Sequence, residues 1–76
     1  MNSQKEISDL ALCAYLSTLG YKLTSTPINS YGNRTIFIFE ASQKMETDIL
    51  NFYNRTARID PLAFIETFRN LKALTR

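Results

Sequence analysis

Apolar and polar residues alternate along the chain with two different periods. Apolar residues recur every three to four positions where a helix is expected, and β-branched and aromatic residues gather where a strand is expected. The segments with helical spacing are residues 9–19, 43–54 and 61–74. The segments typical of strands are residues 21–28 and 34–41, with residues 56–59 as a short third strand or an extended link.

This order predicts the fold class. Turn residues around Gly32 separate the two longer strand segments, which favours an antiparallel hairpin. We therefore expect an α+β fold in which a small antiparallel sheet of two or three strands is covered by three helices in a second layer.

The ends of the helices carry capping signals. Ser8 is the predicted N-cap of the first helix, and Gly20 is predicted to end it because glycine tolerates the left-handed backbone conformation. A capping-box pattern from Ser3 to Glu6 offers a competing start about one turn earlier. Asp60 and Pro61 are typical of the first positions of the last helix.

The first helix contains the unbroken apolar run 10–16, which covers every side of a helix. The strand 34–41 likewise has apolar residues on both of its faces. Because a short chain has little material to cover these surfaces, we expect self-association or a protein partner. The side chains predicted to form that interface are Leu12, Tyr15, Leu16, Phe37 and Phe39.

The composition limits the chemistry. The 76 residues form one predicted domain, 1–76, without histidine and with one cysteine. This excludes histidine-based catalysis, a zinc knuckle and an internal disulfide. Cys13 lies among apolar residues in mid-helix and is predicted to be a core residue.

The carboxylates show no pairing typical of general acid–base catalysis or of a cation loop. Glu40, Glu46 and Asp48 are expected to be solvated charges. We therefore predict that the protein is not an enzyme, and we assign no catalytic, cofactor-binding or metal-binding residue.

The net charge is only +2, but the basic residues are concentrated at one end. Residues 55–76 hold five basic and two acidic side chains. Arg69, Lys72 and Arg76 share one side of the last helix, and Arg55 and Arg58 could extend this stripe. Such a stripe could contact the phosphates of DNA or RNA. The alternative is an ordinary solvated helix face with cations at its C-terminus.

The hairpin suggests a second way to bind nucleic acid. Aromatic rings stack on bases while cations hold the backbone. The residues of these types are Tyr21, Lys22, Tyr31, Arg34, Phe37 and Phe39. The alternative is a central strand whose aromatic side chains are buried.

The N-terminal residues contain no apolar stretch typical of a signal peptide, and no segment reaches the length of a membrane span. The single cysteine suits a reducing compartment. We therefore expect a cytoplasmic protein that does not enter a membrane.

Short motifs along most of the chain resemble a family of very short bacterial and phage proteins of unknown function. The motifs are Ser8-Asp9-Leu10, Ala14-Tyr15-Leu16 and Gly20-Tyr21, then Gly32-Asn33-Arg34 and Phe37-Ile38-Phe39-Glu40, and finally Ile59-Asp60-Pro61, Phe64-Ile65 and Arg69-Asn70-Leu71-Lys72. The resemblance implies a stand-alone domain of phages or mobile elements, and it transfers no active site.

Together these patterns predict a non-catalytic binding module that associates with itself. Its favoured partner is DNA or RNA, as an accessory protein of phage or mobile-element type. The alternative is an adaptor that binds another protein without contacting nucleic acid.

Overall fold

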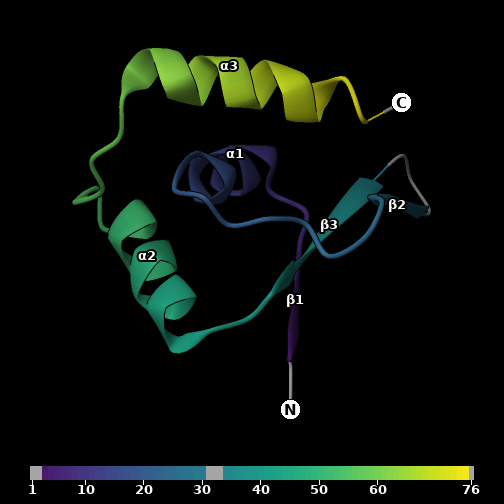
Figure 1. Ribbon diagram of the computed structural model, residues 1–76, viewed down its shortest axis with the longest axis horizontal. Coiled ribbons are helices and arrows are strands. Elements are labelled where there is room, and N and C mark those ends of the chain that lie inside the picture. Colours follow the sequence, from purple (N-terminus) through teal and green to yellow (C-terminus); the bar gives the residue numbers. More distant parts are fainter. Residues whose placement is uncertain (1–2, 31–33, 76) are drawn as a thin grey trace.

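The structure is a computed structural model that describes residues 3–30 and 34–75 (Figure 1). Three strands and three helices follow one another along these residues. They are β1 (Gln4–Ile7), α1 (Leu10–Thr18), β2 (Ile28–Ser30), β3 (Arg34–Glu40), α2 (Gln43–Tyr53) and α3 (Pro61–Lys72). The arrangement confirms the predicted α+β class, with a small antiparallel sheet and three helices.

Helix α1 lies at the centre of the molecule. Figure 1 shows α3 along one side of it, α2 beside it and the strands on the side away from α3. The five consecutive residues of its middle, residues 12–16, are all buried. The apolar run that surrounds this helix is thus covered by the chain itself. The other two helices, α2 and α3, both pack against α1.

Both ends of α1 are capped. Asp9, not Ser8, is the N-cap, and its carboxylate accepts hydrogen bonds from the backbone N–H groups of Ala11 and Leu12. At the other end Gly20 has a φ of +111°, a conformation that side chains rarely adopt. There the N–H of Tyr21 donates to the carbonyl of Leu16, a bond typical of the Schellman motif, which confirms Gly20 as the predicted end.

The sheet has the order β1-β3-β2, with β3 in the middle. The third strand is β1 at the N-terminus, so the capping-box start at Ser3 is wrong. Residues 56–59 contain no strand and link α2 to α3 without regular secondary structure.

The predicted first strand of the hairpin is only partly regular. Leu23 lies opposite Phe39, whereas Ile28 lies opposite Ile36, so five steps along one segment correspond to three along the other. Residues 24–27 therefore lie opposite only residues 37 and 38, and this bulged stretch contains Pro27, which has no N–H to donate to regular pairing. The predicted turn at 31–33 lies outside the described residues.

The two faces of β3 are buried to different extents. Phe37 and Phe39 point into the core, where their side chains are completely buried. Ile7 of β1 lies in the same core cluster. Ile38, on the opposite face, is also buried, while the neighbouring Ile28 is half exposed. The second face of the sheet is therefore largely covered near Ile38 and open near β2.

Helices α2 and α3 form where the apolar spacing predicts them. Ser42 caps α2, and Met45 is the residue of α2 that is buried in the core. Asp60 caps α3 by accepting a hydrogen bond from the N–H of Ala63, and Pro61 occupies the first turn. These observations confirm the predicted starts of both helices.

The central position of α1 makes Leu16 a sensitive site. Leu16→Ala is expected to lower the free energy of unfolding by about 2–5 kcal/mol, because it leaves a cavity between α1 and its neighbours. Leu16→Met keeps the volume and should cost less than about 1.5 kcal/mol. Urea unfolding measures both, with Leu62→Ala on the surface as the control, where a change within about 0.5 kcal/mol is expected. Equal effects of Leu16→Ala and Leu62→Ala would contradict a covered α1.

Candidate functional site

The five side chains predicted to form an interface lie inside the single chain. Leu12, Tyr15 and Leu16 of α1 and Phe37 and Phe39 of β3 are all buried in one core cluster. The premise that the chain cannot cover them is wrong, because α2, α3 and the sheet surround α1. Any association between copies would have to use other residues.

The aromatic side chains of the hairpin do not form a stacking surface. Phe37 and Phe39 are in the core, and Tyr31 lies outside the described residues. Lys22 and Arg34 are exposed, but the rings of Phe37 and Phe39 are not accessible for stacking, so the described residues of the hairpin do not form the predicted base-stacking sheet. The alternative of a central strand with buried aromatic side chains is the one observed.

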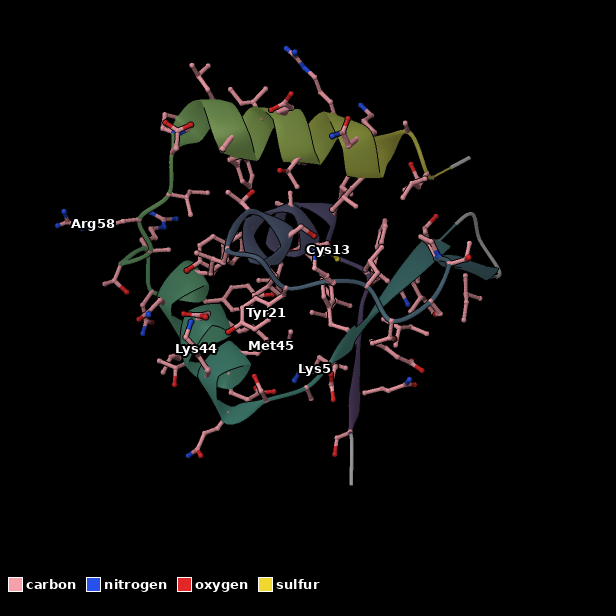
Figure 2. All side chains as sticks on the ribbon, in the orientation of Figure 1. Lys5, Cys13, Tyr21, Lys44, Met45 and Arg58 are labelled. Atoms are coloured by element: carbon pink, nitrogen blue, oxygen red, sulfur yellow. The ribbon has the colours of Figure 1, made fainter. Side chains whose placement is uncertain are left out.

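Tyr21 takes part in a polar cluster with α2. Its hydroxyl donates a 2.6 Å hydrogen bond to the carboxylate of Asp48, and the ammonium of Lys44 lies 3.6 Å from the same carboxylate. Figure 2 shows the labelled side chains of Tyr21 and Lys44 close together at α2. Burial, together with this hydrogen bond, raises the pKa of Tyr21 to about 12. The phenol is therefore held in its protonated form, which suits a structural role and not that of a base.

The carboxylates are used in contacts within the chain. Asp48 is bound to Tyr21 and is largely shielded, which corrects the expectation of a solvated charge. Glu46 forms a 3.2 Å ion pair with Lys5, while Glu40 is exposed at the end of β3. Within the described residues, no three acidic, cysteine or histidine side chains are grouped as ligands of a metal ion.

Cys13 is completely buried in the core, as predicted. Its thiol lies 3.6 Å from the carbonyl oxygen of Ile7, to which it donates a weak hydrogen bond. Burial, with a smaller contribution from the charge of Asp9, raises the pKa of this thiol to about 12. Because the thiolate is the reactive form, Cys13 is chemically inert in the folded protein.

The predicted basic residues lie in two groups. Arg69 and Lys72 are exposed in the last turn of α3, whereas Arg55 and Arg58 are exposed in the segment before α3. Figure 2 shows Arg58 pointing away from the molecule near the start of α3. Arg69 lies eight residue steps, about 12 Å of helical rise, beyond Pro61, so the four cations form two separate groups. Arg76 lies outside the described residues.

Arg55 has an unusual backbone conformation. Its φ of 61° is left-handed, and it follows the C-cap of α2, where glycine is the usual residue. The N–H of Thr56 closes this end of the helix by donating to the carbonyl of Asn51. The left-handed position turns the chain out of α2 and into the segment before α3.

A shallow trough runs along α3 beside its two cations. It has a volume of about 360 Å³ and is lined by Phe64, Ile65, Phe68, Arg69 and Lys72. Phe64 and Phe68 also pack against the core, while Ile65 has 42% of its surface exposed. Leu62, one turn before Ile65, is 74% exposed and is thus the most exposed large apolar residue of the described chain.

The sequence predicted the two cations of this trough, Arg69 and Lys72, but not its apolar lining. Phe64, Ile65 and Phe68 were not among the residues predicted for an interface. The available signal was that Leu62 and Ile65 fall on the side of the helix that carries Arg69, away from the buried Leu71.

None of the helices in the described residues is long and apolar enough to cross a membrane.

The comparison with protein families gives one match. The family model described as a domain of unknown function, DUF5659, matches residues 2–76, and the chain therefore belongs to this family. Comparisons with curated proteins and with solved structures give no match.

The buried thiol gives a test of the core. Cys13 is expected to resist a thiol reagent at about pH 8 in native buffer, because it is buried and its pKa is far above that pH. In urea the unfolded chain should react completely, since its thiol returns to an ordinary pKa. Colour release from an aromatic disulfide reagent measures both rates. Complete reaction of the native protein at the rate of the unfolded one would contradict the buried position.

Proposed function

We propose that this DUF5659 member is a non-catalytic binding module that holds an acidic, amphipathic helix of a partner protein against α3. The supporting observation is the trough of Phe64, Ile65 and Phe68, which is bordered by Arg69 and Lys72. Within the described residues neither cation forms an ion pair. This is the adaptor function considered from the sequence, moved from α1 and the sheet to α3.

The shape of the trough favours a helix as the occupant. Phe64, Phe68 and Lys72 follow one another every four residues, and Ile65 and Arg69 form a parallel row. Two such rows are the ridges of a helix surface, and the groove between them accepts a ridge of side chains from a second helix. An amphipathic helix lying in an apolar groove is a common mode of peptide recognition.

The charges favour an acidic partner. Arg69 and Lys72 stand at the C-terminal end of the trough, where carboxylates of a partner would reach them. Such pairs at the rim mainly speed association and fix orientation. The affinity itself would come from burying apolar surface of Leu62 and Ile65 at about 25 cal/mol per Å².

We also propose self-association and a cytoplasmic location. Self-association would have to use exposed residues such as those of the trough, since the five residues named for it are in the core. A cytoplasmic location is supported by the single cysteine, which has no partner for a disulfide within the chain.

The first test uses a designed peptide as the probe. An acetylated helical peptide with leucine at every third or fourth position and glutamate elsewhere should bind and shift the NMR signals of α3. Ile65→Asp should weaken binding at least tenfold, because it places a carboxylate in the apolar floor. Arg69→Glu with Lys72→Glu should weaken it by a similar factor and remove its salt dependence.

The matched control is Lys22→Glu, which reverses an exposed cation far from the trough in sequence and should leave binding unchanged. Absence of signal shifts in α3 at about 1 mM peptide, a concentration that detects even weak binding, would refute the proposal. Sedimentation of the protein without peptide tests whether a second copy of the chain occupies the trough. A dimer that dissociates on Ile65→Asp would assign the trough to a second copy.

A second candidate is binding of DNA or RNA by an accessory protein of phage or mobile-element type. It is favoured by the exposure of Arg55, Arg58, Arg69 and Lys72, which form no ion pair in the described residues. A phosphate backbone is long enough to contact both groups of cations. The modest net charge of +2 and the apolar residues between the groups make it the weaker candidate.

Fluorescence anisotropy with labelled DNA and RNA tests this second candidate. If phosphates are contacted, Arg69→Ala with Lys72→Ala should reduce the slope of log affinity against log salt by about 1–2. Arg55→Ala with Arg58→Ala removes the same charge at the other end of α3 and shows which group is used. Lack of binding by micromolar protein at about 50 mM salt eliminates nucleic acid as the partner.

A further inference from the structure

The free edge of β1 forms a second surface that shares no lining residue with the trough on α3. β1 stands at the end of the strand order β1-β3-β2 and pairs with β3 alone among the described residues. A strand edge leaves backbone N–H and C=O groups that another strand can bind. Which segment could bind here depends on the backbone groups of β1 that point outward.

The register of β1 against β3 shows which backbone groups of β1 point outward. The N–H of Ala41 donates to the carbonyl of Ser3 at 2.8 Å, so Ser3, Lys5 and Ile7 face β3 in alternation. Across β3 the N–H of Thr24 donates to the carbonyl of Ile38, which confirms that residue 38 faces away from β1. The backbone N–H and C=O groups of Gln4 and Glu6 therefore point outward from the sheet.

A groove lies beside this edge, between β1 and α2. It has a volume of about 310 Å³, and its apolar lining consists of Ile7, Leu12, Ile49 and Tyr53. Ile7 and Leu12 are nearly covered and form the floor, whereas Tyr53 is 60% exposed and forms the far wall. An apolar side chain of an added strand would fit between them.

The charges around the edge are mostly acidic. Lys5 reaches toward α2 in Figure 2 and is bound to Glu46 at 3.2 Å, so this pair is neutral. The exposed Glu6 has no ion-pair partner among the described residues, and Asp9 stands at the end of the groove. Arg34 of β3 lines a smaller pocket with Glu6, so one cation also lies near this edge. Because the two carboxylates outnumber it, a segment that fits here would carry basic side chains.

We propose that β1 binds an extended segment of another protein as a fourth strand, in which apolar residues alternate with lysine or arginine. Because successive side chains of a strand point to opposite faces, the apolar residues would enter the groove toward Tyr53. The basic residues would then lie on the other face of the sheet, beside Glu6. The backbone groups of Gln4 and Glu6 supply the hydrogen bonds.

A second copy of the chain fits this edge poorly. In an antiparallel pair of two β1 strands, the registers that bond Gln4 or Glu6 to Glu6 place either Lys5 opposite Lys5 or Glu6 opposite Glu6. Like charges directly opposite each other destabilise a pair of strands. The register that bonds Gln4 to Gln4 avoids this, but it uses only one outward residue of each β1, so a different chain with the opposite charge is the favoured partner.

The test uses an acetylated peptide of alternating isoleucine and lysine as the probe, with amide hydrogen exchange followed by NMR. Binding as a strand should slow exchange at the amides of Gln4 and Glu6 at least tenfold. Lys5 and Ile7, which already face β3, should change little. Slowed exchange spread evenly over the chain, or none at about 1 mM peptide, would overturn the proposal.

Two matched controls separate the backbone from the side chains. The same peptide with N-methyl groups on the amides that would face β1 should bind at least tenfold more weakly. A peptide with aspartate in place of lysine should also lose binding, because it meets Glu6 and Asp9. Equal binding of the N-methylated peptide would show that no strand is added.

Variants of the protein complete the test. Glu6→Pro removes one outward N–H and none that faces β3, a position where an edge strand tolerates proline, and should weaken binding at least tenfold. Glu6→Gln keeps the N–H and should weaken it less, while Tyr53→Ala should weaken it by removing the wall. Ile65→Asp should leave this binding unchanged, which separates it from the proposed function on α3. The N-methylated peptide decides the question if Glu6→Pro fails to fold.

Discussion

The structure depends on one constraint, which is that α1 is apolar on every side and must be covered on every side. Each of residues 12–16 is buried, although these side chains point in all directions around the helix. A sheet can cover one side of a helix only, so α2 and α3 have to cover the others. This places α3 beyond α1 from the strands, where its inner face is fixed by α1 and its outer face has no neighbour among the residues that the structure describes. The exposed trough on α3 is a consequence of how the centre is covered.

Most of the fold could be predicted because its signals are local. The caps at Asp60 and Ser42 and the chain reversal at Gly20 depend only on nearby residues, and they lie where the sequence indicates. β1 was missed because three of its four residues are polar and its partner residues in β3 are thirty or more positions away. The same segment carries a helix-capping pattern, and only its pairing with β3 overrides it. The strand expected at 21–28 was too long because Pro27 and the bulge interrupt the pairing, which a local alternation does not show.

The functional residues were harder to predict for a physical reason. The sequence shows how many apolar residues a chain has, but not which of them the chain covers. Tyr15 and Phe37 were therefore expected at an interface and lie in the core, while Ile65 was passed over and is exposed. The cations could be found because a charged side chain lies at the surface in almost any fold. Only the structure shows which cations lie close together, because about two turns of α3 separate Arg58 from Arg69.

The two proposed surfaces differ in both shape and charge. The trough on α3 lies between ridges of helical side chains and carries cations, so it suits an acidic helix. The edge of β1 offers backbone groups beside Glu6, so it suits a basic strand. A segment that suits one proposed surface would be disfavoured at the other, because both its secondary structure and its charge would be wrong there. Since the two surfaces share no lining residue, the two proposed segments would not compete for the same side chains.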